Sequence, residues 1–424
     1  MSEDRIRAAA RAVEHQKQWF QQLRTQAAEG APIALVNADV PHEIFRALDI
    51  PYVVNQWWAS IIAAKRRGAE SLEALRSRGL PDQSLQYDAM PLGEQLLPED
   101  RRPWGGLPRP AFAVAERHGD VTQKVFEQWS TGSGAAGETE VFLLSRTAAD
   151  PVPDRWWELV PHRWEEAFGA ERIDLLQAEI LELTAWLEER TGRRLDRQRL
   201  AEIMRLSNEQ AEWNRRTRDL IASCRPCPVP VRDVIPAVMI PQWHRGTRWA
   251  VDAARSLYEE VRERVESAAA APGPETGSAE ERLRLMWIGR GLWSDLDLYS
   301  RFQQSHGAVF VWSMYLAIAA DGYIRYGEDP LRALAARFTG ITDQLYVPPW
   351  SAQWYAKEAL SHGVDGVVHL VADDTPGAAF ITEELEGSGI PALEIRANNA
   401  DQRSSAAAGI PERIAEFLRS RVSR

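Results

Sequence analysis

The polar run Asp373-Asp374-Thr375-Pro376 contains residue types that could do chemistry. It directly follows a predicted buried strand at 366–372 and precedes a predicted helix. A helix N-terminus attracts negative charge, so an anion or a thioester oxygen could bind there beside the two carboxylates. The alternative is structural, because Asp and Thr are also common N-cap residues. Both interpretations stay open.

Cys224 and Cys227 form a C-x-x-C pair and are the only cysteines of the chain. A zinc site or an iron–sulfur cluster needs three or four ligands. The pair also ends a predicted helix, whereas a thioredoxin-type motif opens one. We therefore interpret both cysteines as structural.

The segment GSGAAG, with Gly132, Gly134 and Gly137, has the glycine spacing of a dinucleotide-binding loop. Such a loop works when a strand precedes it and a helix N-terminus follows it to meet the pyrophosphate. Here a helix comes before the glycines and a strand comes after them. We therefore expect a plain helix-to-strand connection.

The surrounding elements indicate an α/β protein. Strand–helix–strand spacing begins the chain, with strands at 32–37 and 51–54, and a buried strand follows at 138–145. Helical periodicity dominates 161–268. From 282 onward strands and helices alternate. Ligands bind beyond the carboxyl ends of such strands, so the candidate site edges are the loops after Gly289, Met314, Ala372 and Ala397.

We therefore predict an α/β fold with two Rossmann-like parallel-sheet domains joined by a helical segment. The N-terminal α/β domain is assigned to residues 1–160. The helical middle segment and its linker cover 161–275, and the C-terminal α/β domain covers 276–424.

The composition limits the class of protein. The 424 residues carry 61 acidic and 50 basic side chains, a net charge of −11, which argues against a nucleic-acid surface. The longest apolar run, 309–320, is shorter than the roughly 20 residues that cross a bilayer. The N-terminus has no apolar signal core. We expect a cytoplasmic protein that binds neither nucleic acid nor a membrane.

Tryptophan is abundant, at 17 residues. Trp57 and Trp58 in QWW, and Trp312 and Tyr315 in WSMY, lie near strand ends or early in a helix, where a crevice would form. We expect these four side chains to line a substrate pocket. The alternative for all of them is ordinary helix–sheet packing.

Several segments resemble the benzoyl-CoA reductase and 2-hydroxyacyl-CoA dehydratase family of iron–sulfur subunits. They are VPHEIFRALDIPYVV, SNEQAEWNRRTRDLIASCRPCPVPV, DPLRALAARF and a C-terminal stretch that includes DGV, GIPAL and RIAEFL. Their order and spacing, from about 30 to 420, make the case. The resemblance implies a dimer of related subunits, a CoA thioester substrate and a [4Fe-4S] cluster on three cysteines. It also implies a separate ATP-driven activator.

The sequence departs from that family at the cysteines. The resemblance places them near Tyr87, at Gly119 just before Asp120, and at Thr375, and none of these residues is cysteine. Thiolates hold a cubane cluster, and glycine has no ligand atom. We therefore expect no metal and no cofactor on this chain, with a CoA thioester as substrate. The alternative is a [4Fe-4S] cluster on relocated ligands.

These expectations combine into a cluster-free subunit of an acyl-CoA-processing complex of the hydro-lyase class. Polar groups at the former cluster site would act as acid, base or oxyanion donors. They are Asp88, Asp120, Asp373, Asp374 and Thr375. The tryptophans would suit an aromatic acyl group. The chain would form a heterodimer or larger hetero-oligomer with a related subunit. The alternative is a structural or regulatory partner with no chemistry of its own.

Overall fold

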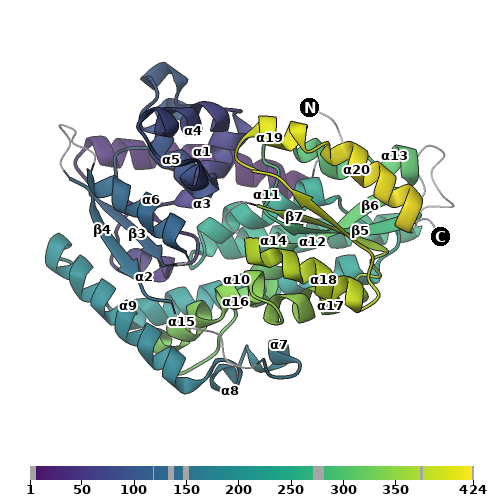
Figure 1. Ribbon diagram of the computed structural model, residues 1–424. Coiled ribbons are helices and arrows are strands. Elements are labelled where there is room, and N and C mark those ends of the chain that lie inside the picture. The colour runs from purple at the N-terminus through teal and green to yellow at the C-terminus, as the bar shows by residue number, and fades with distance from the viewer. Residues whose placement is uncertain are drawn as a thin grey trace.

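The computed structural model describes residues 6–117, 119–131, 138–146, 152–270, 281–372 and 376–422. Two four-stranded sheets, in which all neighbouring strands are parallel, form its framework. Helices cover both sheets (Figure 1). This architecture confirms the predicted α/β class with two Rossmann-like sheets.

The first sheet has the strand order β2-β1-β3-β4. Its strands are β1 (Ala34–Val36), β2 (Tyr52–Val54), β3 (Phe112–Glu116) and β4 (Glu140–Leu144). The sequence predicts β1, β2 and β4 but misses β3. The segment FAVAE contains two alanines, which have low strand propensity, and tertiary burial of all five residues stabilises it as a central strand.

Six helices accompany this sheet. They are α1 (Arg7–Ala28), α2 (His42–Ala47), α3 (Asn55–Ala64), α4 (Gly68–Ser77), α5 (Met90–Glu94) and α6 (Asp120–Thr131), with short 3-10 turns that include η2 (Tyr87–Ala89). The pattern at 55–79 predicts one helix, but the structure has two. Arg66 lies between them with a φ of 56°, a left-handed conformation that a continuous helix does not contain.

The middle of the chain is helical. It contains α7 (Trp156–Leu159), α8 (Trp164–Phe168), α9 (Ala170–Thr191), α10 (Arg197–Ser223), α11 (Val231–Trp243) and α12 (Arg248–Ala270). Asp196 caps α10, because its side chain accepts hydrogen bonds from the backbone N–H groups of Gln198 and Arg199. Helix α10 packs against α2 from the first part of the chain and against α15 from the last part, so it bridges the two halves.

The second sheet has the order β6-β5-β7-β8. Its strands are β5 (Leu283–Gly289), β6 (Ala308–Ser313), β7 (Gly366–Val371) and β8 (Ala392–Arg396). The sequence predicts all four. The alternation of strands and helices after residue 282 predicts a helix at 292–307, and this prediction is wrong. That segment has a 3-10 turn, η5 (Leu296–Ser300), and one turn of helix, α13 (Gln303–His306), since its Ser and Asp residues favour turns over helix.

The second half of the chain contains further helices, some of which pack on this sheet. They are α14 (Met314–Ala317), α15 (Pro330–Thr339), α16 (Ile341–Tyr346), α17 (Trp350–Ser361), α18 (Ala379–Gly387), α19 (Gln402–Ala407) and α20 (Ile410–Phe417), with a π-helical turn, η6 (Ile318–Gly322), after α14. Among the described residues no helix is long and apolar enough to span a membrane. The domain limits given above stay a prediction.

The two sheets share one topology. In each, the second strand lies on one side of the first, and the third and fourth strands lie on the other side. The strand order therefore reverses between β1 and β3 and again between β5 and β7. In open α/β sheets a ligand crevice forms at such a switch point, outside the carboxyl ends of the strands.

A buried ionic cluster joins the two halves. Glu43 of α2 accepts hydrogen bonds from Nε of Arg245 at 2.7 Å and from Nη1 of Arg337, on α15, at 2.5 Å. All three side chains are buried. Burial raises the pKa of Glu43, but the charges of Arg245 and Arg337 outweigh it and hold that pKa at about 2. The pairing keeps the carboxylate ionised where an isolated charge would be costly.

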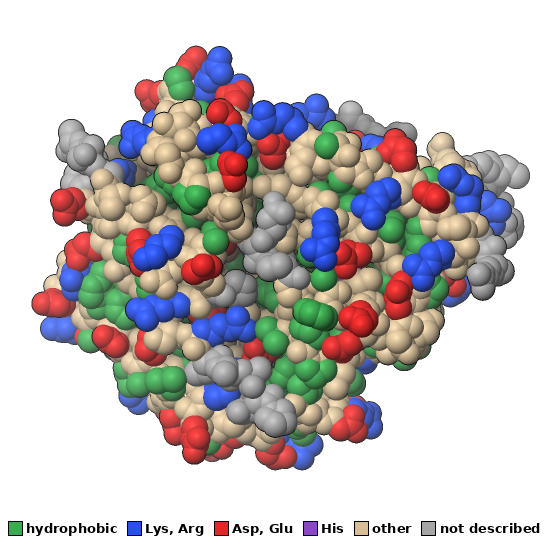
Figure 2. All heavy atoms as spheres, in the orientation of Figure 1, with side chains coloured by type: hydrophobic (Ala, Val, Ile, Leu, Met, Phe, Trp, Pro, Cys, Tyr) green, Lys and Arg blue, Asp and Glu red, His purple; other side chains and the backbone are tan. Residues whose placement is uncertain are grey.

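Side chains of both charges cover the face shown in Figure 2. Blue and red groups are interspersed there, and the described residues form no extended patch of one sign on it. Phosphate binding needs clustered positive charge. The expectation that the protein binds no nucleic acid stays a prediction.

Candidate functional site

A cavity of about 60 Å³ lies between the carboxyl ends of the two sheets. Asp39, after β1, lines it from the first sheet. Arg290, after β5, and Tyr315, after β6, line it from the second sheet. The cavity is therefore at the place where parallel sheets bind ligands. The loops after Gly289 and Met314 were predicted as site edges, and residues of both line this cavity.

Two carboxyl groups lie at the carboxyl end of the first sheet, and one of them, Asp39, lines the cavity. Asp39 is half-buried in the loop after β1. Glu116 is the last residue of β3, which pairs with β1. The pairing continues past the end of β1, because the backbone N–H of Asn37 donates to the carbonyl of Val114 in β3 at 2.8 Å. Glu116 is buried and accepts a hydrogen bond from Oγ1 of Thr342 at 3.3 Å. The strand pairing thus brings the two carboxyl groups to the same sheet edge.

Burial changes the proton affinity of both groups. It raises the pKa of Asp39 to about 6, and the charge of Asp88 adds to this, while Arg290 and Arg146 oppose it. Burial likewise raises the pKa of Glu116 to about 8, with the charge of Asp39 adding to it. Carboxyl groups with pKa values near neutrality can both donate and accept protons, as acid–base catalysis requires.

Arg290 reaches from the second sheet toward the first. Its Nη1 lies 3.4 Å from Oδ1 of Asp88, and its guanidinium carbon lies 5.2 Å from the ring centroid of Tyr87. Both partners belong to η2, which lies between α4 and α5 in the first half of the chain. A guanidinium at the cavity wall can stabilise negative charge on a ligand oxygen.

Tyrosine hydroxyls complete the polar lining. The backbone N–H of Gly291 donates to the hydroxyl of Tyr315 at 2.6 Å, and the hydroxyl of Tyr87 donates to the carbonyl of Gln56 at 2.8 Å. Burial raises the pKa of Tyr315 to about 12, so its hydroxyl is protonated at neutral pH. Because that hydroxyl accepts from Gly291, its own proton can be donated to a ligand.

The structure brings together three of the predicted site residues. Tyr87 and Tyr315 line the cavity, and Asp88 faces Arg290. Asp120 does not line the cavity. It is exposed at the first position of α6, where its Oδ1 accepts a hydrogen bond from the backbone N–H of Val121. Gly119 is exposed as well, with open space around it.

Other predicted residues fall outside the described part of the chain. These are Asp373, Asp374, Thr375 and the glycines Gly132, Gly134 and Gly137. Strand β7 ends at Val371, and its Leu370 pairs with Gly289 at the end of β5. The role assigned to the Asp-Asp-Thr run stays a prediction.

The three predicted pocket tryptophans are part of the protein core. Trp57 donates from Nε1 to Gln16 at 2.9 Å, and the ring of Trp58 stacks on Phe20 at 4.5 Å between centroids. Trp312 donates to Oε2 of Glu358 at 2.8 Å. None of the three is among the described residues that line the cavity. Trp57 and Trp58 contact α1, and Trp312 contacts α17, so core packing accounts for their positions; their role in substrate binding stays a prediction.

The sequence analysis missed two charged groups that line the cavity, Asp39 and Arg290, and a buried acid at the same sheet end, Glu116. The sequence could have indicated two of them. Asp39 follows the predicted strand 32–37, and Arg290 directly follows Gly289, a predicted strand end. Glu116 had no such signal, since β3 itself was not predicted.

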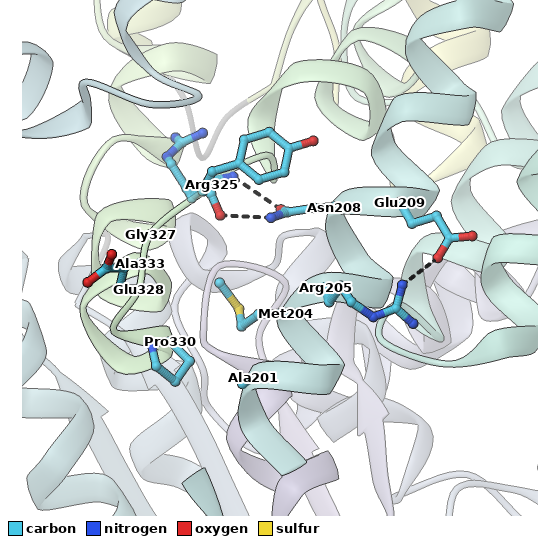
Figure 3. Close-up of a pocket in the computed structure, with 11 residues that line it drawn as sticks. Ala201, Met204, Arg205, Asn208, Glu209, Arg325, Gly327, Glu328, Pro330 and Ala333 are labelled. Carbon is cyan, nitrogen blue, oxygen red and sulfur yellow. Dashed lines mark hydrogen bonds and ion pairs between the residues drawn. The ribbon is translucent and has the colours of Figure 1, made fainter. Parts of the chain in front are cut away.

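A second, larger cavity of about 390 Å³ lies between α10 and the segment before α15 (Figure 3). Asn208 of α10 donates to the carbonyl of Arg325 at 2.8 Å and accepts from its N–H at 3.1 Å. Arg205 and Glu209, on the same helix, form an ion pair at 3.0 Å. These groups are already partnered, and the cavity is not at a strand end, so we regard the smaller cavity as the candidate site.

Comparison with known proteins identifies the family. A family model described as 2-hydroxyglutaryl-CoA dehydratase, D-component, matches residues 37–420. The chain belongs to this D-component family. The resemblance inferred from the sequence is thereby confirmed.

Two curated relatives of the D-component family match most of the chain. The (R)-phenyllactyl-CoA dehydratase alpha subunit of Clostridium sporogenes is 22% identical over 393 residues, covering 91% of this chain and 88% of that protein. The (R)-2-hydroxyisocaproyl-CoA dehydratase alpha subunit of Clostridioides difficile is 20% identical over 392 residues, covering 91% and 89%.

The residues of this D-component family member do not fit a cubane cluster at the positions that the resemblance implies. Tyr87 has a ring packed under Arg290, and Gly119 has no side chain. Thr375 is outside the described residues. Within the described ranges, no group of three or more His, Cys, Asp or Glu side chains is placed to hold a metal ion.

The two cysteines lie at the other end of β5 from the cavity. The carbonyl of Cys224 accepts from Nη1 of Arg284, near the start of β5, at 2.8 Å. The cavity begins after Gly289, where β5 ends. The thiol of Cys227 donates to the carbonyl of Val229 at 3.1 Å, and burial raises its pKa to about 12. Such a thiol is a poor source of the thiolate that metal binding needs.

Proposed function

We propose that this chain is a cluster-free subunit of an acyl-CoA-processing complex. Its cavity would bind the thioester end of an acyl-CoA for non-redox elimination or addition of water. The observation that carries the proposal is the convergence of Asp39, Arg290 and Tyr315 on one cavity at the carboxyl ends of both sheets. Family membership supports a thioester ligand, because both relatives are named as acyl-CoA dehydratase subunits.

The chemistry follows from the acidity of a thioester. The carbonyl acidifies the α-proton, so a base can remove it while negative charge collects on the carbonyl oxygen. Asp39 takes that proton, and Arg290 and Tyr315 donate to the oxygen. The C–H electrons then form the carbon–carbon double bond, and the bond from the β-carbon to its hydroxyl breaks. The leaving hydroxide recovers the proton as water, and hydration is the reverse of these steps.

The proposal requires no redox centre on this chain. Two cysteines are too few for a cubane cluster, and their position at the start of β5 argues against relocated ligands near the cavity. The relatives are named alpha subunits, which supports a second, related subunit beside this chain. A purely structural role would give no reason for a half-buried carboxyl group and an arginine at one cavity.

Binding and metal content test this function. The full chain, with its partner where one copurifies, is prepared anaerobically and titrated with CoA thioesters and free CoA. We expect a thioester to raise the melting temperature more than free CoA does, because a ligand of the folded state stabilises it. We also expect no iron and no acid-labile sulfide. If the thioester and free CoA raised the melting temperature equally, the proposal that the cavity binds the thioester end would be refuted. Stoichiometric iron on this chain would refute its cluster-free state.

A further inference from the structure

We infer that the chain has a second binding site, which takes a small organic anion with a ring-sized apolar body. The site is a third cavity, of about 250 Å³, between α1, the start of β2 and the end of α11. Of the described residues that line it, only Trp243 also lines the cavity of the proposed function. Three features carry the inference: a positioned cation, a buried histidine and aromatic walls.

The cation is Arg46, in the last turn of α2. Its Nη2 donates to the hydroxyl of Tyr52 at 2.7 Å, and that hydroxyl donates to the carbonyl of Trp243 at 3.2 Å. The ring of Tyr52 also lies 5.4 Å from the guanidinium carbon. Within the described ranges Arg46 forms no ion pair, and its Nε has no hydrogen-bond partner. The guanidinium is therefore held at the cavity wall with its charge uncompensated.

The other charges of the cavity wall cancel each other. Arg199 and Asp49 are the remaining charged residues among the described lining, and both terminal nitrogens of Arg199 donate to the carboxylate of Asp49. Arg46 thus leaves the lining with a net positive charge, although the chain as a whole carries −11. A partly desolvated guanidinium forms its strongest hydrogen bonds with carboxylate or phosphate oxygens. The cavity therefore favours an anion.

A second donor comes from His244, which lines the cavity and is only 6% exposed. Its ring nitrogens have no hydrogen-bond partner among the described residues. Burial and the charge of Arg46 hold the pKa of His244 well below its usual range, so its ring is neutral at neutral pH. A neutral imidazole has one N–H donor and one acceptor. Polar groups this deeply buried normally have partners, and a ligand oxygen would provide one.

The remaining walls are apolar or aromatic. The ring of Trp19 lies 4.7 Å from the ring of His244 at an angle of 82°, so the two rings form a corner. Leu23, Ile50 and Pro51 add apolar surface. A cavity that binds benzene measures about 150 Å³, so this larger cavity has room for one ring and an anionic group. The ligand class is a ring-bearing carboxylate or phosphate monoester, with its ring against the aromatic wall.

Calorimetric titration of the full chain, with its partner where one copurifies, tests the ligand class. The probes are benzoate, phenyl phosphate and benzamide, which has the shape of benzoate without its charge. We expect at least one of the anions to bind with a stoichiometry of one, and benzamide to bind roughly tenfold more weakly or worse, because it lacks the charge-assisted hydrogen bond. The tighter anion identifies the preferred group. If neither anion binds better than benzamide, the inference is wrong.

Substitution of the cation tests the location. Arg46→Gln keeps a polar side chain but removes the charge, so we expect it to bind the tighter anion roughly tenfold more weakly or worse. Arg301→Gln is the control, because Arg301 is exposed, pairs with Asp295 and does not line the cavity. It should bind like the wild type. Unchanged affinity in Arg46→Gln would refute the site.

A pair of surface variants decides the location if Arg46→Gln does not fold. Gln22→Glu introduces a carboxylate at an exposed position of α1 that lines the cavity, so repulsion should weaken anion binding severalfold. Gln21→Glu adds the same charge at the neighbouring exposed position, which does not line the cavity, and should have little effect. Equal effects of the two variants would place the anion elsewhere and refute the site.

Competition separates this inference from the proposed function. The anions are titrated without any thioester, so their failure to bind refutes the second site and leaves the proposed function intact. Failure of thioesters to bind would refute the proposed function and leave the second site intact. We expect the tighter anion to bind also when a CoA thioester is present in excess. A thioester that displaces it would show that both use one site, and would refute a separate one.

Discussion

The two sheets have the same strand order, but the described residues at their carboxyl ends differ in chemistry. The end of the first sheet presents two acids, Asp39 and Glu116, whose pKa values burial raises to about 6 and about 8. The end of the second sheet presents a cation, Arg290, and a neutral donor, Tyr315. Identical topology therefore fixes where the site is, and the residues that follow each strand decide what each side does.

The different residues at the two sheet ends also suggest different roles for the two halves in the proposed reaction. In the proposed reaction, groups of the first sheet would transfer the proton, and groups of the second sheet would stabilise negative charge. Arg290 already crosses the boundary to reach Asp88, 202 positions away in the sequence. Among the described residues that line the cavity, the acid Asp39 comes from the first half and the cation Arg290 from the second, so this pairing depends on the two sheet ends facing each other. The following changes test that division.

Removing the acid of the first sheet should have the largest effect. Asp39→Asn keeps the size and polarity of the side chain but abolishes its proton exchange, so we expect turnover of the preferred thioester to fall by about 10² to 10⁴. Steady-state kinetics of the complex measure this, and circular dichroism checks the fold. Asp120→Asn, at an exposed acid on α6, is the control and should not change the rate. If Asp39→Asn kept the wild-type rate, another group would have to transfer the proton.

Removing the cation of the second sheet should weaken ligand binding. It should slow the reaction less than the loss of Asp39 does. Arg290→Ala deletes a charge-assisted hydrogen bond to the ligand oxygen, worth about 1.5–3 kcal/mol, so we expect affinity to fall by roughly 10- to 100-fold. Arg290→Lys should recover part of it. Calorimetric titration gives both values. Arg301→Ala, which breaks a surface ion pair with Asp295, is the control. If Arg290→Ala bound as tightly as wild type, the second sheet would not supply the cation.

Neutralising the buried acid of β3 should change stability with pH. The folded pKa of Glu116, about 8, lies above its ordinary value of 4.5, so the wild type loses stability as pH rises between these two values. Glu116→Gln cannot ionise and keeps an oxygen for Thr342. We expect the variant to match wild type near pH 5 and to exceed it near pH 9 by a few kcal/mol, at about 1.4 kcal/mol per pKa unit. Thermal unfolding at both pH values measures the difference; a constant difference would mean that Glu116 is not the titrating group.

The smallest effect on the ligand is expected at a core tryptophan. Trp312→Phe removes the donor to Glu358 but no cavity wall, so thioester affinity should stay within twofold of wild type. Stability should fall by about 1–3 kcal/mol, because a buried carboxylate loses a partner. Titration and denaturant unfolding separate the two effects. A large loss of affinity would indicate that Trp312 lines the substrate pocket, as the sequence predicts.

The sequence predicts the second sheet better than the first for a physical reason. The strands β5 to β7 are mostly apolar runs, and β8 lies between turn residues and a helix, so their local pattern suffices. Strand β3 is short and alanine-containing, and burial between β1 and β4 determines it. The site follows the same rule. Arg290 could be located from the end of β5, but its contact with Asp88 joins segments that no local pattern relates.

The Glu43 cluster has a consequence for the independence of the halves. Its carboxylate comes from α2 and one of its guanidiniums from α15, and all three groups are buried. A fragment that ended between the sheets would leave that carboxylate without one of its counterions, and breaking a buried pair in this way typically costs about 3–5 kcal/mol. That is a large share of the net stability of an ordinary domain. The molecule should therefore melt in a single cooperative transition, and neither half should survive truncation as an autonomous folding unit.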